Sequence, residues 1–350
     1  MVLKICVMDV LSPARLRPPW AACCWDTVLL ARHELVQYPL GAISARPLNP
    51  RVRAAGLLLC YVVGVFAGGA LLAPWLFHLA QWAAGEFPAL QGLASQPFHR
   101  YVNRSLLVTA LAGLWPLLRA LQLADRRALG LVNPLTARRP LAFGLALGFG
   151  SLLLAAVLMA LAGVRSFNFS LAMPVLLKLL VGATLSAVAV ALLEEFVFRA
   201  VVFGALRRVW PLWAALLASA VLYSAVHFLA RVEHVGPIGW DSGLALLPRM
   251  MSGLATPEAL VPAALTLLLG GVALGLAYQR TGNLWFAIGL HAGWVFWLKV
   301  FKTVTVTGVG TANAFWGTEK LLDGWLACFV MAAVLVVASR LPQAPPQHSG

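Results

Sequence analysis

Charged residues are scarce in this chain, and acidic residues are the scarcest. Of its 350 residues 11% are charged, with 12 Asp and Glu against 26 Lys and Arg. A soluble globular domain is about 25% charged and about 45–50% apolar. Here 61% of the residues are hydrophobic, and the mean hydropathy is +0.86. The composition excludes an ordinary soluble domain and predicts an all-α, polytopic membrane protein.

Cysteine is also scarce, and its spacing excludes two common uses of the residue. The odd number of cysteines and the absence of any C-x-x-C pair argue against a disulfide framework and against a zinc knuckle. The H-E-x-x-H motif of zinc proteases is absent as well. Zinc bound by histidines and glutamates from different helices remains chemically open, but we expect no metal and no other cofactor. The cysteines are Cys6, Cys23, Cys24, Cys60 and Cys328.

The net charge of +14 does not indicate a nucleic-acid partner. Many basic residues lie in short loops beside apolar runs, where they contact anionic lipid and set the orientation of the chain. We therefore expect membrane lipid as a partner and no nucleic acid. The distribution favours a cytoplasmic N-terminus and C-terminus. The richness in alanine, leucine and arginine is typical of a GC-rich bacterial genome, which favours the cell inner (plasma) membrane.

The apolar runs divide the chain into three parts. Residues 1–53 lack the apolar core of a signal peptide, so we expect an N-terminal cytoplasmic extension. Residues 54–340 form the predicted helical membrane domain, and residues 341–350 a disordered tail. A span needs about 20 apolar residues, and about eight runs qualify. These runs are 54–80, 104–124, 141–164, 176–206, 212–230, 260–278, 284–301 and 325–339.

Two adjacent glutamates, Glu194 and Glu195, lie within one of the most apolar runs, V-A-L-L-E-E-F-V-F-R. A charged side chain there costs about 2.5–3.5 kcal/mol on insertion scales and is usually functional. Side chains at i and i+4 lie on one helix face, which predicts an ion pair between Glu195 and Arg199. Adjacent positions diverge by about 100°, so Glu194 is left to face a cavity.

Two histidines in other runs are candidates to meet Glu194. The runs 176–206 and 212–230 form a hairpin. Glu194 lies 14 residues before Arg208 and His227 lies 16 residues after Pro211, which is about 21 and 24 Å from the turn. His227 is therefore expected at the depth of Glu194. His291 lies eight residues after Asn283, about 12 Å from the nearest turn, so it is expected to match this depth less well unless the loop before it sits deep or its helix is tilted.

A carboxylate and a neutral imidazole that face one water can share its proton, as general base catalysis at pH 7 requires. A second histidine across the cavity is able to hydrogen-bond a developing oxyanion. The three groups suit hydrolysis of a peptide or ester bond inside the membrane. The loop 231–258 between two of the runs is either a lid over such a cavity or a connector, and loops of this length are more often connectors.

The order of the motifs resembles the CPBP (Abi) family, which contains the CAAX prenyl endoproteases and lysostaphin-resistance-protein-A-like proteins. The resemblance covers about residues 180–300. Its specific part is Glu-Glu-x-x-x-Arg, from Glu194 to Arg199. An aromatic-x-x-x-His motif follows, with Tyr223 where phenylalanine is usual. The third motif, His-x-x-x-Asn, begins at His291 but has Val295 in its last position.

The resemblance implies an intramembrane glutamate endopeptidase of eight helices that works without metal on a peptide or membrane-protein substrate. By analogy, Glu194 and His227 activate the water and His291 helps to build the oxyanion hole. The same analogy gives Glu195 and Arg199 the task of supporting the site.

Position 295 departs from this pattern, because valine has no side-chain donor. Losing one oxyanion-hole donor typically costs about 10²–10³ in rate. Trp294 carries an indole N–H next to this position and is a candidate to replace the missing donor, although it faces about 100° away. Tyr223 is expected to pack with its hydroxyl hydrogen-bonded.

Other interpretations of the same residues stay open. Val295 favours a catalytically silent membrane scaffold or immunity protein of the same fold. A proton-coupled transporter or channel can use buried carboxylates and histidines as a relay, but the chain shows no internal repeat, which transporters usually have. The plainest alternative is an ion-pair network that only holds helices together.

Overall fold

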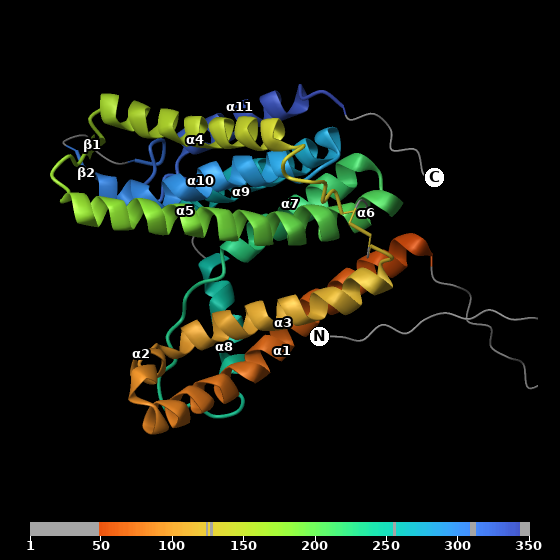
Figure 1. Cartoon of the computed structure of the whole chain (residues 1–350), viewed down its shortest axis with the longest axis vertical. Coiled ribbons are helices and arrows are strands. Elements are labelled where there is room, and N and C mark those ends of the chain that lie inside the picture. The colour runs from red at the N-terminus through yellow and green to blue at the C-terminus, as the bar shows by residue number, and fades with distance from the viewer. Residues whose placement is uncertain (1–48, 124, 127–128, 255–256, 309–312, 344–350) are drawn as a thin grey trace, which may run out of the picture. The chain divides into compact units, whose positions relative to one another are not determined.

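The computed structural model describes residues 49–123, 125–126, 129–254, 257–308 and 313–343 (Figure 1). Most of the predicted extension at residues 1–53 and of the predicted tail at residues 341–350 therefore lies outside the described residues. The same is true of Cys6, Cys23 and Cys24, whereas Cys60 is exposed and Cys328 is buried, each as a free thiol. The described chain is helical apart from two short strands, which confirms the all-α prediction.

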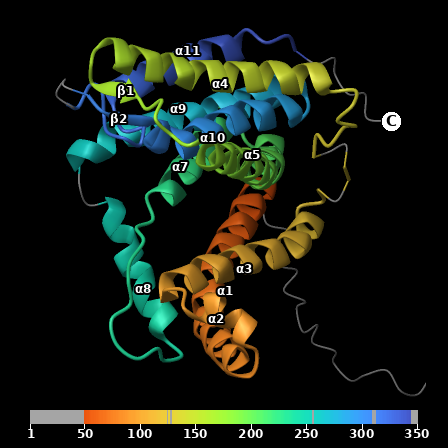
Figure 2. The same ribbon diagram turned by 60° about the vertical axis from the view of Figure 1, so that its left-hand side comes forward.

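Helices α1 (Pro50–Glu86) and α3 (Phe98–Ala120) pack along each other and are joined by the short helices η1 (Pro88–Leu90) and α2 (Gln91–Ala94) (Figures 1 and 2). Asn49 caps α1, since its side chain accepts a hydrogen bond from the Arg51 amide at 3.0 Å. With 37 residues, α1 is about 55 Å long. It is therefore longer than the hydrocarbon core of a bilayer, which is about 30 Å thick.

Six further helices form the part of the fold that contains both histidines and both glutamates. They are α4 (Arg138–Leu161), α5 (Met173–Glu195), α7 (Leu212–His227), α9 (Pro257–Thr281), α10 (Trp285–Val304) and α11 (Trp325–Ser339). Helix α10 is the central one, because it packs on α4, α5 and α9. Strands β1 (Arg165–Phe167) and β2 (Thr305–Thr307) pair antiparallel beyond the ends of α4 and α10.

Glycines allow α4 and α10 to cross with their backbones in contact. A Cβ atom on Gly144 would lie 2.2 Å from the carbonyl oxygen of Phe286, and one on Gly148 would lie 2.1 Å from that of Leu290. Small residues at such crossings are typical of helix packing in membranes. The crossing fixes the height and rotation of α10 at the turn that carries His291.

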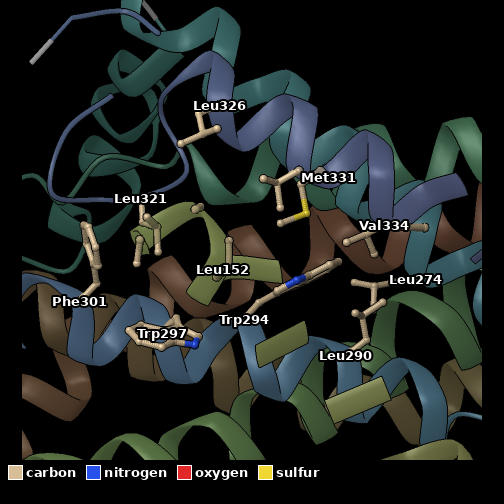
Figure 3. Close-up of a cluster of buried hydrophobic side chains, with 14 of the residues drawn as sticks. Leu152, Leu274, Leu290, Trp294, Trp297, Phe301, Leu321, Leu326, Met331 and Val334 are labelled. Atoms are coloured by element: carbon tan, nitrogen blue, oxygen red, sulfur yellow. The ribbon is translucent and has the colours of Figure 1, made fainter. Parts of the chain in front are cut away.

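The largest core cluster surrounds the next turns of α10. Figure 3 shows Leu290 and Trp294 of α10 among Leu152 of α4, Leu274 of α9 and Met331 of α11. Leu152, Leu274 and Leu290 are 0% exposed. Helix α10 is therefore buried on almost all sides.

Among the described residues, four helical segments are long and apolar enough to cross a membrane. They are Pro50–Glu86, Arg138–Leu161, Met173–Val209 and Leu260–Thr281, and Leu212–His227 and Trp325–Ser339 are shorter apolar helices. Each of the eight predicted runs thus contains a helix. The prediction of about eight spans is supported for the four long segments and, in part, for the two shorter helices. Helices α3 and α10 are less apolar, because α3 carries Arg100, Arg104 and Arg119 and α10 carries Lys299 and Lys302.

The segment Met173–Val209 contains a feature that the sequence does not reveal. Between α5 and α6 (Gly204–Val209), residues Phe196–Phe203 form a π-helix, η2. A π-helical stretch inside an α-helix is rare and is frequent at functional sites. It begins at the residue that follows the two glutamates.

The long loop 231–258 contains helix α8 (Ser242–Met250) and the short helix η3 (Met251–Leu254). Leu246 and Met250 of α8 pack with Ala73 of α1 and Tyr101 of α3 in a separate buried cluster. The Ala230 amide also donates to the Met250 carbonyl at 2.7 Å. These contacts support the interpretation of this loop as a connector.

Candidate active site

The two glutamates at the end of α5 differ in environment, as the helical spacing predicts. The side chain of Glu195 is 0% exposed, and its Oε2 lies 3.2 Å from Nε of Arg199, which is 2% exposed. The side chain of Glu194 is 29% exposed and borders a cavity. The predicted ion pair between Glu195 and Arg199 is therefore confirmed.

Glu195 has a second partner. Its Oε1 accepts a hydrogen bond of 2.8 Å from Nδ1 of His291, which is also buried. Glu195 therefore bridges Arg199 on its own segment and His291 on α10. A carboxylate that makes charge-assisted bonds to two partners holds both of them in fixed orientations.

Arg199 lies against an aromatic ring on its other side. The guanidinium carbon is 4.4 Å from the ring centre of Tyr223, which is a cation–π arrangement. Nη1 and Nη2 of Arg199 have no hydrogen-bond partner among the described residues. The Tyr223 ring is therefore a contact that stabilises the buried charge of Arg199.

Both histidines converge on one oxygen of Glu194. Nε2 of His227 lies 3.7 Å from Oε2 of Glu194, and Nε2 of His291 lies 3.8 Å from the same oxygen. The predicted meeting of Glu194 and His227 is confirmed. His291 also reaches this depth, which the sequence allowed only if the loop before its helix sits deep or the helix is tilted.

The depth of His291 has a structural cause. The turn before α10 is covered by the segment that joins α3 to α4. The Leu284 amide donates to the Gly130 carbonyl at 3.2 Å, and the Trp285 indole donates to the Val132 carbonyl at 2.8 Å. Leu284 is 1% exposed. Because α10 starts below the protein surface, a few turns are enough to bring His291 to the depth of Glu194.

The hydrogen bonds of the two histidines determine which ring nitrogen carries the proton. Nδ1 of His227 lies 2.7 Å from the Tyr223 carbonyl, and a carbonyl only accepts, so Nδ1 of His227 is the donor. Nδ1 of His291 donates to the Glu195 carboxylate in the same way. In a neutral ring Nε2 is then an acceptor. Two imidazole lone pairs and one carboxylate oxygen therefore face each other.

A cavity of about 490 Å³ adjoins this cluster. Its polar lining includes Glu194, His227 and His291 from α5, α7 and α10, and its apolar lining includes Val190, Leu267, Leu298, Leu322 and Met331. Two exposed cations, Arg231 and Lys299, also border it. A cavity of this size, largely apolar with a few convergent polar groups, is typical of a ligand or substrate site.

Val295 and Trp294 both border the cavity. The indole Nε1 of Trp294 donates to Oγ of Ser151 on α4 at 3.0 Å. That N–H is engaged away from the glutamates, so the idea that Trp294 replaces the donor missing at position 295 is not supported by its contacts. The indole ring belongs to the packing of α10 on α4 and α11 instead (Figure 3).

Tyr223 departs from its expected role. Its ring packs against Phe198 and His227, with ring centres 5.2 and 4.5 Å away. Within the described part of the chain, its hydroxyl makes none of the observed side-chain hydrogen bonds, in contrast to the bonded hydroxyl that the sequence predicts. Tyr223 borders the cavity.

The distances within this cluster exceed those between the ligands of a zinc ion. Tetrahedral zinc ligands at 2.0–2.1 Å from the ion lie about 3.4 Å apart, whereas the Nε2–Oε2 distances around Glu194 are 3.7 and 3.8 Å. Among the described residues, no group of three His, Cys, Asp or Glu is arranged to hold a metal ion.

In a comparison with family models, residues 174–297 match the Rce1-like family, described as type II CAAX prenyl endopeptidase Rce1-like. No curated protein and no solved structure matches the chain. The matched region runs from α5 into α10 and includes all five residues of the glutamate and histidine motifs. It agrees with the extent of about 180–300 expected from the motifs. Residues 174–297 of this helical membrane protein are thus similar to the Rce1-like type II CAAX prenyl endopeptidase family.

Proposed function

We propose that this chain is an intramembrane endopeptidase that hydrolyses a peptide bond with a water molecule activated by Glu194 and His227. The observation that carries the proposal is the convergence of two Nε2 atoms on Oε2 of Glu194, at 3.7 and 3.8 Å. All three atoms are acceptors when the rings are neutral. A water molecule supplies the hydrogens that such a group of acceptors needs.

In the proposed mechanism, the water donates one hydrogen to Glu194 and the other to Nε2 of His227. A lone pair of its oxygen then faces the cavity. The oxygen attacks the carbonyl carbon of the scissile bond, Glu194 takes the proton, and the carbonyl oxygen becomes negative. When the C–N bond breaks, the proton passes from Glu194 to the leaving amine. The products are a new C-terminal carboxyl group and an amine, and the Glu194 carboxylate is restored.

The remaining residues of the cluster act as positioning residues in this proposal. Glu195 accepts from Nδ1 of His291 and so keeps the lone pair of His291 directed at Glu194. Arg199 neutralises Glu195 within the protein, which prevents two uncompensated carboxylates from lying side by side. The buried pair therefore supports the orientation of the groups that touch the water.

The substrate that we propose is a peptide segment or a membrane protein in the cell inner (plasma) membrane. The apolar wall of the cavity suits an apolar segment that enters from the membrane. Comparing the termini of membrane proteins in the source organism and in its deletion strain would identify the substrate. Equal sets of termini would contradict an endogenous membrane-protein substrate.

The orientation that we propose has both termini in the cytoplasm, based on the basic residues of the loops. Alkaline phosphatase fused after residue 340 would then be inactive, and fused within the loop 231–241 it would be active. The reverse pattern would contradict this orientation.

The mechanism is tested with Glu194→Gln and His227→Ala in the purified full chain. The probe is a panel of fluorescence-quenched peptides that includes one ending in a prenylated CAAX sequence, the substrate class in the family's name. Both variants are expected to lose cleavage while their unfolding midpoints stay close to that of the unchanged chain. Glu86→Gln serves as a matched control, because Glu86 is exposed at the end of α1.

Unchanged cleavage by either Glu194→Gln or His227→Ala would refute the mechanism. Absence of cleavage by the unchanged chain, in the panel and in the organism, would favour a silent scaffold of the same fold. The observation that favours a silent scaffold is Val295, which borders the cavity and has no side-chain donor.

A further inference from the structure

The proposed hydrolysis needs a hydrogen-bond donor for the carbonyl oxygen that becomes negative. Donors fixed in advance around such an oxygen make one of the largest contributions to acyl-transfer catalysis. Val295 has no donor, and the indole of Trp294 is engaged with Ser151. Some other side chain along the cavity must therefore provide it.

Most of the remaining donors are already used inside the protein. The Thr266 hydroxyl donates to the Pro262 carbonyl at 2.7 Å. The Nδ1 donors of His227 and His291 are used by Tyr223 and Glu195, which leaves their Nε2 atoms as acceptors. A cationic His291 would have a donor at Nε2, but the Glu194 carboxylate at 3.8 Å would then attract it.

The charged groups along the cavity are less suitable. Arg231 and Lys299 are exposed, so water solvates them and their long side chains lose conformational entropy when they are held in place. Arg199 is buried, but its guanidinium lies against the Tyr223 ring and Arg199 does not border the cavity.

The Tyr223 hydroxyl is the donor that remains. Tyr223 borders the cavity, and its ring centre lies 4.5 Å from that of His227 and 6.1 Å from that of His291. Among the described residues, the hydroxyl is neither hydrogen-bonded nor one of the enclosed polar atoms without a partner. It is therefore open to the cavity, beside the two rings that face the proposed water.

We propose that the Tyr223 hydroxyl donates the hydrogen bond that stabilises the carbonyl oxygen as it becomes negative. This inference rests on the proposed endopeptidase function. As the water oxygen bonds to the carbonyl carbon, the π electrons move to the carbonyl oxygen, which accepts the Tyr223 O–H bond. When the tetrahedral intermediate collapses, the electrons return, the C–N bond breaks, and Tyr223 keeps its proton throughout.

Arg199 assists this donor through the ring. Its charge lies 4.4 Å from the ring centre, and it draws electron density from the phenol, which makes the O–H group a stronger donor. The same charge is close to the place where the negative charge develops, in surroundings of low dielectric constant where such an interaction is strong. Arg199 thus acts on the reaction through Tyr223 as well as through Glu195.

Tyr223→Phe removes only the hydroxyl and keeps the ring under Arg199. With the quenched peptide that the unchanged chain cleaves fastest, kcat is expected to fall about 10²–10³-fold, as for other lost oxyanion donors, with little change in KM and in the unfolding midpoint. Tyr61→Phe is the matched control, since the Tyr61 hydroxyl donates to the Ala110 carbonyl away from the cavity. That variant should keep its kcat.

Two further measurements separate catalysis from structure. A phosphonamidate analogue of the cleaved peptide mimics the tetrahedral intermediate, so its affinity should fall in Tyr223→Phe by the same factor as kcat/KM. Val295→Asn places an amide one turn after His291, and in the Tyr223→Phe background it should restore part of the lost rate. A merely structural role of the hydroxyl predicts neither result.

The outcomes distinguish this inference from the proposed function. If Glu194→Gln abolishes cleavage but Tyr223→Phe keeps the full kcat, the donor role of Tyr223 is overturned and the endopeptidase remains. A fall in kcat with unchanged affinity for the phosphonamidate would also overturn it. If the unchanged chain neither cleaves the panel nor binds the phosphonamidate, the endopeptidase itself is refuted.

Discussion

Removing one partner of the buried Glu195–Arg199 pair is expected to destabilise the chain strongly. The two side chains are 0% and 2% exposed, and their charged atoms lie 3.2 Å apart. Arg199→Met keeps much of the side-chain volume but leaves the Glu195 carboxylate without its cation inside the protein. Breaking a buried pair in this way costs about 3–5 kcal/mol.

The second partner of Glu195 sets where in this range the value falls. Nδ1 of His291 donates to Oε1 of Glu195 at 2.8 Å before and after the substitution, so the carboxylate is never entirely without a hydrogen bond. The Arg199→Met substitution also leaves the Tyr223 ring without its cation, a contact that contributes about 0.5–2 kcal/mol. We therefore expect the free energy of unfolding to fall by about 3–4 kcal/mol.

The chain offers a matched control at its surface. Nζ of Lys302 lies 2.5 Å from Oε1 of Glu319, closer than the buried pair, but the two side chains are 69% and 45% exposed. Exposed pairs contribute about 0–1 kcal/mol, because water screens the charges and the side chains lose entropy. Lys302→Met is therefore expected to lower the free energy of unfolding by less than about 1 kcal/mol.

The assay is denaturant unfolding of the full chain in detergent micelles, followed by tryptophan fluorescence. Single and double variants of each pair form a double-mutant cycle, which isolates the coupling energy between the two side chains. For the buried pair, the cycle uses Glu195→Gln and Arg199→Met. A coupling no larger than that of Lys302 with Glu319 would refute the reasoning that burial, rather than distance, sets the strength of these pairs.

Three further predictions concern the crossing of α4 and α10 and the cavity. Gly148→Ala puts a Cβ atom 2.1 Å from the Leu290 carbonyl oxygen, so it should destabilise the chain by about 1–3 kcal/mol and slow cleavage by moving His291. Gly150→Ala lies on the same helix, where an added Cβ has nothing within 4 Å, so it should change neither the free energy of unfolding nor the rate of cleavage. Equal effects of the two substitutions would contradict the role of the close approach of Gly148 to Leu290. Trp294→Phe should cost about 1 kcal/mol of stability for the lost bond to Ser151 and leave kcat unchanged, whereas a 10²-fold loss of kcat would place the indole N–H in the oxyanion hole. Dialysis against EDTA should leave cleavage unchanged, since the distances around Glu194 exceed those of zinc ligands, and an activity that disappears and returns with added zinc would refute this.

The parts of the site that the sequence predicts are those set by one helix or one hairpin. The pair Glu195–Arg199 follows from the i, i+4 spacing alone, because neighbouring turns of one helix determine it. The meeting of Glu194 and His227 follows from residue counts on two sides of one turn, since antiparallel neighbours share that turn.

The parts that the sequence does not predict depend on contacts between distant segments. The depth of His291 is set by the loop that covers Leu284 and by the glycine crossing of α10 on α4. The partner of the Trp294 indole, Ser151, lies on another helix. The π-helix after Glu195 is likewise invisible in the sequence pattern, because its residues are as apolar as those of an α-helix in the same place.

The arrangement of the polar groups favours a base that activates water over a proton relay. A relay needs titratable groups in a line that continues toward both sides of a membrane. In the described part of the cavity, the two histidines converge instead on Oε2 of Glu194. One turn earlier on α5 the cavity is lined by Val190, which has no titratable group to continue a relay. Glu195 is neutralised by Arg199, so Glu194 is the carboxylate that is left to take a proton. A single base with two further acceptors beside it suits a molecule that donates two hydrogens and then attacks, which is what water does in hydrolysis.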